Sequence, residues 1–258
     1  MARFDTRPLY MNAHDFRYLL EKLGPSLGFW RAAEIAALRE QEYEAPVLDL
    51  GCGDGFLSAM VLPKIEVGLD PDQEALERAV LRQLYARRIA APVEEAALPP
   101  ASISTIFSNS ALEHVARIND ALSAIARALK PGGRLITTSP TEAFSKALAL
   151  PLKRYADKRN RHFEHLNLWS VEEWAQRLAP VGLELETVRP YLRLPLVRLW
   201  DMLELMQMLQ LGRHRVFGKV WRRLPDSVLE RLAHYASTVD LSAPPSSGGR
   251  LIVARKTK

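Results

Sequence analysis

The chain has 258 residues and a mass of 29.1 kDa, which suits one large domain or two small ones. Its composition, 48% hydrophobic and 25% charged, excludes a disordered, collagenous or coiled-coil protein. The net charge is +5, and the excess of basic residues lies in segments 146–161 and 190–224. These segments are either solvated helix faces or a surface that binds an anionic partner.

Helices are expected before residue 44, because apolar residues recur there at the spacing of one helix face. These residues are Phe16, Leu19, Leu20 and Leu23, then Trp30, Ala33, Ile35 and Leu38.

From residue 46 onward, short apolar runs alternate with helical patterns. Strands are predicted at 46–50, 64–69, 103–108, 134–139, 183–188 and 250–254, with one more ending before residue 93. Helices are predicted at 56–62, 72–88, 115–129 and 170–178, the last opening with a capping box of Ser170 and Glu173. This alternation predicts an α/β fold with a doubly wound, seven-stranded, mostly parallel sheet.

Two helical insertions interrupt the alternation, at 140–169 after the fifth strand and at 190–248 after the sixth. Both follow the C-terminal end of a strand, which is the edge where open α/β sheets bind ligands. The insertions are therefore expected to line a substrate site.

A glycine-rich loop follows the first strand of the sheet, in the sequence VLDLGCGDGF. Gly51, Gly53 and Gly55 let the backbone turn sharply and approach a ligand closely. A nicotinamide-dinucleotide fingerprint needs its third glycine at position 56, which is Phe56, and no G-K-[ST] follows for a phosphate-binding P-loop. Both of these classes are therefore disfavoured.

Carboxylates follow the next strands. Asp70 ends the second strand in VGLDPD, where a carboxylate can accept both hydroxyls of a ribose. Glu94 and Glu95 lie near the end of the third strand, and SNSALEHV, residues 108–115, follows the fourth.

Together with LKPGGRLI at 129–136, these elements resemble the class I S-adenosylmethionine-dependent methyltransferases, in particular the small-molecule, type 11-like group. The resemblance covers residues 46–189 and implies a Rossmann-like methyltransferase fold with S-adenosyl-L-methionine as cofactor. It divides a single domain, 1–258, into N-terminal helices (1–44), a cofactor-binding half (45–139) and the two substrate or lid insertions.

The resemblance also implies roles for individual residues. The glycine loop would hold the methionine part of the cofactor, Asp49 its ammonium and Asp70 its ribose. Glu94 or Glu95 would contact the adenine amino group, and Ser108 and Asn109 would lie beside the methyl group. The expected cofactor-binding set is Asp49, Gly51, Cys52, Gly53, Gly55, Asp70, Pro71, Glu94, Glu95, Ser108 and Asn109.

Three histidines are candidate catalytic bases, because imidazole suits proton transfer near neutral pH. His114 follows the fourth strand, and His162 and His165 lie in the first insertion. A helix-start histidine bonded to backbone, or an ordinary loop histidine, is the structural alternative for each.

No metal is expected. Relatives that use a divalent ion carry E-x-x-E-H after the fourth strand, but here the first position is Ser110, which leaves only Glu113 and His114. The single cysteine, Cys52, excludes a cysteine-based cluster and an intramolecular disulfide.

The second insertion opens with an apolar segment, Tyr191 to Leu211. It is interpreted, in order of preference, as a core element, a homodimer face, a lid over an apolar substrate or a peripheral membrane contact. The lid interpretation, with Lys153, Arg154, Arg159 and Arg161 near the mouth, predicts an amphipathic or anionic acceptor.

The predicted function is methyl transfer to a small molecule, at a hydroxyl on a partly apolar substrate. The alternatives are a methyltransferase of protein or RNA, or a non-catalytic S-adenosylmethionine-binding partner subunit. No nucleic-acid-binding module is recognisable, so nucleic acid is not expected as a partner. A cytoplasmic location is expected, because the sequence has neither a membrane-spanning run nor a secretory signal.

Overall fold

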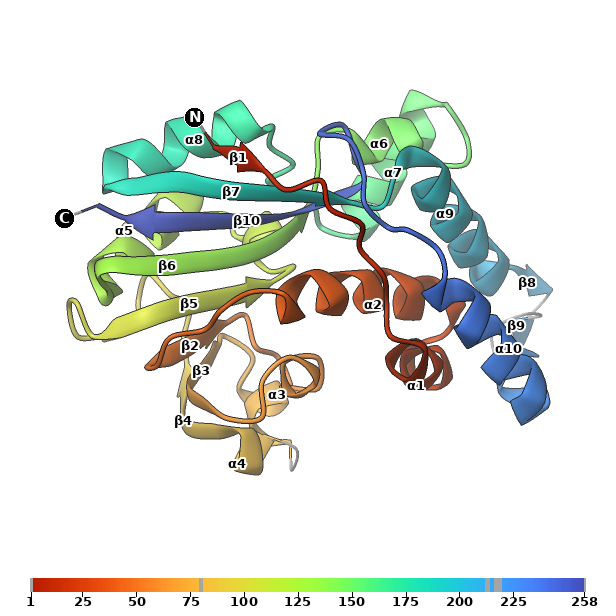
Figure 1. Ribbon diagram of the computed structural model, residues 1–258, viewed down its shortest axis with the longest axis horizontal. Coiled ribbons are helices and arrows are strands. Elements are labelled where there is room, and N and C mark those ends of the chain that lie inside the picture. Colours follow the sequence, from red (N-terminus) through yellow and green to blue (C-terminus); the bar gives the residue numbers. More distant parts are fainter. Residues whose placement is uncertain (1, 79–80, 212–213, 216–219, 258) are drawn as a thin grey trace.

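The computed structural model describes residues 2–78, 81–211, 214–215 and 220–257. Its main sheet has the strand order β1-β7-β10-β6-β5-β2-β3-β4, and every neighbouring pair is parallel except the two that involve β10 (Figure 1). The strands are β1 (Arg3–Phe4), β2 (Val47–Leu50), β3 (Ile65–Asp70), β4 (Tyr85–Ala90), β5 (Ile103–Asn109), β6 (Leu129–Pro140), β7 (Leu183–Tyr191) and β10 (Gly249–Lys256). The predicted doubly wound, mostly parallel α/β sheet is confirmed, with β1 as an eighth strand.

Helices cover both faces of this sheet and extend past one end of it (Figure 1). The α-helices are α1 (Ala13–Leu23), α2 (Pro25–Arg39), α3 (Gln73–Glu77), α4 (Leu81–Leu84), α5 (Ile118–Ala128), α6 (Phe144–Ala147), α7 (Lys153–His162), α8 (Val171–Leu178), α9 (Leu194–Met208) and α10 (Asp226–Ser237). Short 3-10 turns occur at Ser58–Met60, Leu112–His114, Ala179–Val181 and Val220–Arg223, and β8 (Gln210–Leu211) pairs with β9 (His214–Arg215) in a small hairpin. The expected N-terminal helices and the capping box of Ser170 with Glu173 are both present.

Alternation along the strands divides the interior into two cores. On β5, Phe107 packs in the core beneath α1 and α2, whereas its neighbour Ile106 packs in the core beneath α5 and α8. Ile136 and Leu135 on β6 divide in the same way. Because successive side chains of a strand point to opposite faces, both faces of the sheet are apolar and both are covered.

The predicted helix 72–88 is confirmed at α3 and at α4, Leu81–Leu84, but is wrong from Tyr85 onward, where the chain forms a strand. The short α3 ends at Glu77, and β4 pairs in parallel with β3 along the edge of the sheet. Tyr85 starts that strand with a buried ring whose hydroxyl donates to Asp49. Strand pairing and this buried contact therefore outweigh the helical spacing of the apolar residues in this segment. Two of those apolar residues, Ala79 and Val80, lie outside the described residues.

The predicted helix 56–62 is reduced to a 3-10 turn, Ser58–Met60. Pro63 follows directly, and the residue before a proline disfavours helical backbone angles.

The two insertions form α6 with α7 and α9 with α10. On α9, Val197 and Trp200 are buried, whereas Met202 and Met206 are about half exposed. One side of α9 is thus a core element. For its exposed side, a homodimer contact and a membrane contact both remain predictions. None of the described helices is both long and apolar enough to cross a membrane.

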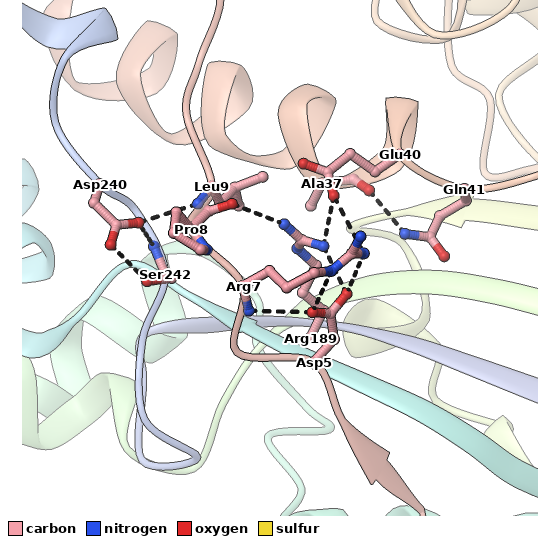
Figure 2. A network of polar contacts seen from close by, with 10 residues as sticks. All are labelled: Asp5, Arg7, Pro8, Leu9, Ala37, Glu40, Gln41, Arg189, Asp240 and Ser242. Atoms are coloured by element: carbon pink, nitrogen blue, oxygen red, sulfur yellow. Dashed lines mark hydrogen bonds and ion pairs between the residues drawn. The ribbon is translucent and has the colours of Figure 1, made fainter.

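A polar network binds the N-terminal segment, residues 5–9, to β7 and to the segment before β10 (Figure 2). Asp5 accepts a hydrogen bond from the buried guanidinium of Arg189 on β7 at 2.7 Å, and Glu40, just after α2, lies 2.6 Å from the same group. Asp240 accepts from the backbone amides of Leu9 and Ser242. These contacts hold α1 and α2 over the end of the sheet where the ligand site lies.

Candidate active site

The glycine loop packs directly against the loop after β5. The amide of Gly51 donates to the carbonyl of Leu69 at 2.8 Å, and the φ angles of Gly51, Gly53 and Gly55 are 72°, 52° and 70°. A Cβ added at Gly51 would stand 2.3 Å from the Cβ of Ala111, whereas one added at Gly53 would meet nothing within 4 Å. Gly51 is therefore required by close packing, and Gly53 faces open space suited to a ligand.

Asp70 joins the ends of β2 and β3. Its carboxylate accepts hydrogen bonds from the amides of Gly53 at 2.7 Å and of Asp72 at 2.8 Å. A carboxylate offers about four acceptor positions, so these two bonds leave capacity for the hydroxyls of a ligand.

A cavity of about 460 Å³ opens beside this carboxylate. It lies within the range of about 300–1,000 Å³ typical of small-molecule sites. Its lining residues all fall between positions 50 and 117: Leu50, Gly51, Leu69, Asp70, Pro71, Pro92, Val93, Glu94, Ser110, Ala111, His114, Val115, Ala116 and Arg117. The volume of this cavity and the free acceptor capacity of Asp70 suit a nucleoside-bearing cofactor. We name the cavity the cofactor pocket.

A second, smaller cavity of about 90 Å³ adjoins it, and we name it the acceptor pocket. Ser110 and His114 line both pockets. The remaining lining residues come from α2, the 3-10 turn after β5, the end of β6 and the two insertions: Leu27, Trp30, Arg31, Glu113, Pro140, Phe144, Phe163, His165 and Trp200. The acceptor pocket is thus walled by N-terminal and inserted elements, and the cofactor pocket by the central sheet.

Of the expected cofactor residues, Gly51, Asp70, Pro71 and Glu94 line the cofactor pocket. Glu95 does not; it is exposed and lies 3.5 Å from Arg117.

Two other expected cofactor residues lie behind the loop instead. Asp49 is buried and accepts from the Tyr85 hydroxyl, and burial raises its pKa to about 7. Cys52 is buried with its amide donating to the Leu69 carbonyl at 3.2 Å, and burial raises the pKa of its thiol. Neither side chain lines either pocket.

Ser108 and Asn109 do not line a pocket, because β5 continues through both of them. Ser108 is fully buried within the sheet, and Asn109 accepts from the Thr138 hydroxyl at 2.6 Å. The chain leaves the strand at Ser110, whose φ is 48°, and it is this serine that lies at the junction of the two pockets.

The three histidines are placed differently. His114 lies at the junction with its Nδ1 3.1 Å from the Glu164 carbonyl, and His165 lines the acceptor pocket with its ring 5.9 Å from that of His114. Burial lowers the pKa of His165 to about 4. His162 is exposed and lies against Phe163, outside both pockets.

Two buried carboxylates at the acceptor pocket were not predicted as site residues. Glu34, on α2, accepts from Trp30 Nε1 at 2.7 Å and from Arg31 at 2.6 Å. Glu113 is 2% exposed, and burial, with Glu34 nearby, raises its pKa to about 8. The sequence placed Glu113 only as a weak metal candidate; among the described residues no group of three or more His, Cys, Asp or Glu could hold a metal ion.

The basic residues of the insertions are only partly free to meet an anion. Lys153, Arg154 and Arg161 on α7 are exposed, but Arg159 is buried with its Nε 2.9 Å from the Asp201 carboxylate. Arg213 and Lys219 lie outside the described residues.

The sheet order and the positions of the glycine loop and Asp70 match the class I S-adenosylmethionine-dependent methyltransferase fold expected from the sequence. Residues 10–188 match the family model described as a methyltransferase domain, and the chain belongs to that family. S-adenosylmethionine is its cofactor, as expected.

Curated relatives are similar over part of the chain. An uncharacterized methyltransferase of Mycobacterium tuberculosis is 39% identical over 93 residues, 34% of this chain and 47% of the relative. Trans-aconitate 2-methyltransferase of Sinorhizobium fredii is 29% identical over 150 residues (52% and 56%), and tRNA U34 carboxymethyltransferase of Hahella chejuensis is 30% identical over 140 residues (51% and 43%). The chain spans about half the length of these relatives, whose acceptors differ in kind.

Solved structures share the fold along nearly the whole chain. A methyltransferase of Thermotoga maritima is 17% identical, with a TM-score of 0.58 over 94% of this chain and 100% of that one. Phosphoethanolamine N-methyltransferase 2 of Haemonchus contortus, solved with S-adenosylhomocysteine, is 16% identical, with a TM-score of 0.54 over 94% of this chain and 60% of that one.

Proposed function

We propose that the chain transfers the methyl group of S-adenosylmethionine to a small, partly apolar molecule bound in the acceptor pocket. The observation that carries this proposal is that Ser110 and His114 line both pockets. A cofactor in one pocket and an acceptor in the other would meet across these two residues. Bringing two reactants together in this way supplies much of the acceleration of a direct displacement.

The chain's own residues would position and protect the reactants. When bound, S-adenosylmethionine supplies an electrophilic methyl group. Asp70 would accept the ribose hydroxyls, and Glu94 would accept from the adenine amino group. His114 is anchored through Nδ1 at the Glu164 carbonyl, which leaves Nε2 as the nitrogen that would take a proton from a hydroxyl acceptor.

The size and walls of the acceptor pocket support a small molecule rather than a protein or an RNA. The pocket holds about 90 Å³ and is lined by Trp30, Phe144, Phe163 and Trp200, which pack against one another. This volume is below the range of about 300–1,000 Å³ for sites of drug-sized ligands, so the pocket suits a compact acceptor with an apolar body.

Calorimetry tests the cofactor part of the proposal. The purified chain should bind S-adenosylhomocysteine with micromolar affinity and show no measurable heat with NAD. Failure to bind S-adenosylhomocysteine would overturn the proposed function.

A transfer assay tests the acceptor part. The chain is incubated with methyl-labelled S-adenosylmethionine and either a panel of small alcohols, amines and carboxylates or unmodified tRNA. Label should enter the small molecules. Label in tRNA alone would replace the proposal with RNA methylation, and binding without transfer to any acceptor would favour the non-catalytic partner subunit.

A further inference from the structure

Glu113 lines the acceptor pocket, and one oxygen of its carboxylate is buried without a hydrogen-bond partner among the described residues. The side chain is 2% exposed and lines the pocket, and no described group bonds its Oε2. The backbone around it is fixed, because the Glu113 carbonyl accepts from the amides of Leu166 at 2.8 Å and Asn167 at 3.0 Å. A buried carboxylate oxygen is costly to leave unbonded, so its position in a pocket points to a donor supplied by a ligand.

The nearby cation is already matched by another carboxylate. Arg31 donates to Glu34 Oε2 at 2.6 Å, while Trp30 Nε1 and the Ser110 hydroxyl donate to Glu34 Oε1. Arg31 thus hydrogen-bonds Glu34 and acts on Glu113 only through space, where its charge lowers the pKa of Glu113 less than burial raises it.

The histidines and tyrosine around Glu113 do not supply a hydrogen-bonded cation. His114 Nε2 lies 3.8 Å from Glu113 Oε1, which is beyond hydrogen-bond distance. Burial lowers the pKa of His165 to about 4 and raises the pKa of Tyr191, so both are neutral at pH 7.

Aromatic rings form the rest of the wall. Trp30 lies 5.1 Å from Trp200 and 5.8 Å from Phe144 between ring centroids, and Phe163 lies 5.4 Å from Trp200. The faces of such rings attract cations. Arg159, which lies over Phe163 at 4.6 Å, is balanced by Asp201 and adds no net charge.

We propose that the acceptor pocket binds a small amine as its ammonium ion, with an N–H donated to Glu113 Oε2 and the apolar part against the aromatic wall. This inference rests on the proposed function and names its acceptor class, in place of the hydroxyl expected from the sequence. An alcohol could satisfy the hydrogen bond but brings no charge to balance the ionised form of Glu113, which is the minor form in the free protein at pH 7. An ammonium ion satisfies both, and Glu113 is placed to accept its proton.

Matched probes of one shape test the proposal. 2-Phenylethylamine and 2-phenylethanol differ only in the amine and the hydroxyl, and phenylacetate adds an anion. Each is titrated by calorimetry, up to millimolar concentration, into the protein saturated with S-adenosylhomocysteine. The amine should bind at least tenfold more tightly than the alcohol, and phenylacetate should bind most weakly.

Proton release gives a second measurement. With a pKa of about 8, Glu113 is mostly protonated at pH 7 in the free protein, and an ammonium ion would bind its ionised form. Amine binding at pH 7 should therefore release close to one proton, seen by repeating the titration in buffers of different ionisation enthalpy. The alcohol should release none.

Variants assign these effects to one carboxylate. Glu113→Gln keeps the shape of the side chain and should abolish both the amine preference and the proton release, while the affinity for S-adenosylhomocysteine stays within twofold. Glu74→Gln removes an exposed carboxylate of α3, which lines neither pocket, and should change neither effect.

Three results would overturn the proposal: no binding of the amine, equal or tighter binding of the alcohol or phenylacetate, or an amine preference that survives Glu113→Gln. Because binding of S-adenosylhomocysteine is measured separately, each of these results would leave the proposed methyltransferase function standing.

Discussion

Arg189 donates a hydrogen bond to Asp5 at 2.7 Å, and its guanidinium is only 1% exposed (Figure 2). Asp5 lies in the N-terminal segment and Arg189 lies on β7, 184 residues away in sequence. This pair holds the segment that leads into α1 and α2, and α2 supplies Trp30 and Arg31 to the acceptor pocket. The contact therefore joins the segment before α1 and α2 to the strand that leads into the second insertion, and both α2 and the second insertion contribute residues to the acceptor pocket.

Removing Asp5 should destabilise the fold. Asp5→Ala leaves the buried Arg189 with Glu40 alone, and breaking a buried ion pair costs up to about 3–5 kcal/mol. Because Glu40 still pairs with Arg189, we expect the free energy of unfolding to fall by only about 1–3 kcal/mol, as measured by urea unfolding. Arg7→Ala, at an exposed partner of the same carboxylate, should cost less than about 1 kcal/mol. Equal effects of the two variants would show that the buried pair contributes no more than the surface one.

Asp70 should contribute directly to cofactor affinity. Asp70→Ala removes the acceptor for the ribose hydroxyls, and a hydrogen bond to a charged group is worth about 1.5–3 kcal/mol. Affinity for S-adenosylhomocysteine should therefore fall by roughly 10- to 150-fold in calorimetry. Glu74→Ala, an exposed carboxylate on α3, is the matched control. An unchanged affinity for the Asp70 variant would remove Asp70 from the cofactor site.

Glu113 should make the stability of the free protein fall as pH rises. Its pKa is about 8 in the folded state against about 4.5 ordinarily, so between these values the folded state retains a proton that the unfolded state has lost. The free energy of unfolding should then decrease by up to about 1.4 kcal/mol per pH unit from this group.

Urea unfolding between pH 5.5 and 8 measures this slope. Glu113→Gln should remove the contribution of Glu113 to the change of unfolding free energy with pH, and this variant should be more stable than the wild type at pH 8. Glu164→Gln should keep the wild-type pH dependence. A Glu113→Gln variant with the wild-type slope would mean that Glu113 has an ordinary pKa in the folded protein.

The cofactor half of the site could be predicted because its signals are local. A buried strand followed by spaced glycines, and an acid at the end of the next strand, are each readable within ten residues, and both are found at one edge of the sheet. After the fourth strand, Ser108 and Asn109 are the residues expected beside the methyl group, whereas the residue that lines both pockets is Ser110. The sequence does not show that β5 continues to Asn109 before the backbone turns at Ser110.

The acceptor half could not be predicted in the same way. Helical spacing indicates that Trp30 is buried, but not that α2 folds back over the end of the sheet to meet Phe144 and Trp200, which lie more than a hundred residues further along the chain. Glu34 and Glu113 become recognisable as a pair only when tertiary packing brings α2 against the loop after β5. Long-range contacts of this kind leave no local pattern.

The contact between Gly51 and Ala111 offers a compensated test of how the two pockets are joined. Gly51→Ala should be strongly destabilising and abolish binding of S-adenosylhomocysteine, because the new Cβ would stand 2.3 Å from the Ala111 Cβ at a φ of 72°. Ala111→Gly in the same chain removes the clash but not the backbone strain, which costs about 1–2 kcal/mol for a non-glycine residue. The double variant should therefore recover most of the stability and part of the binding. Gly53→Ala, with a similar φ of 52° but no atom within 4 Å of the new Cβ, measures that strain alone. If Ala111→Gly fails to rescue Gly51→Ala in thermal unfolding, the glycine loop and the loop after β5 do not pack together in solution as they do here.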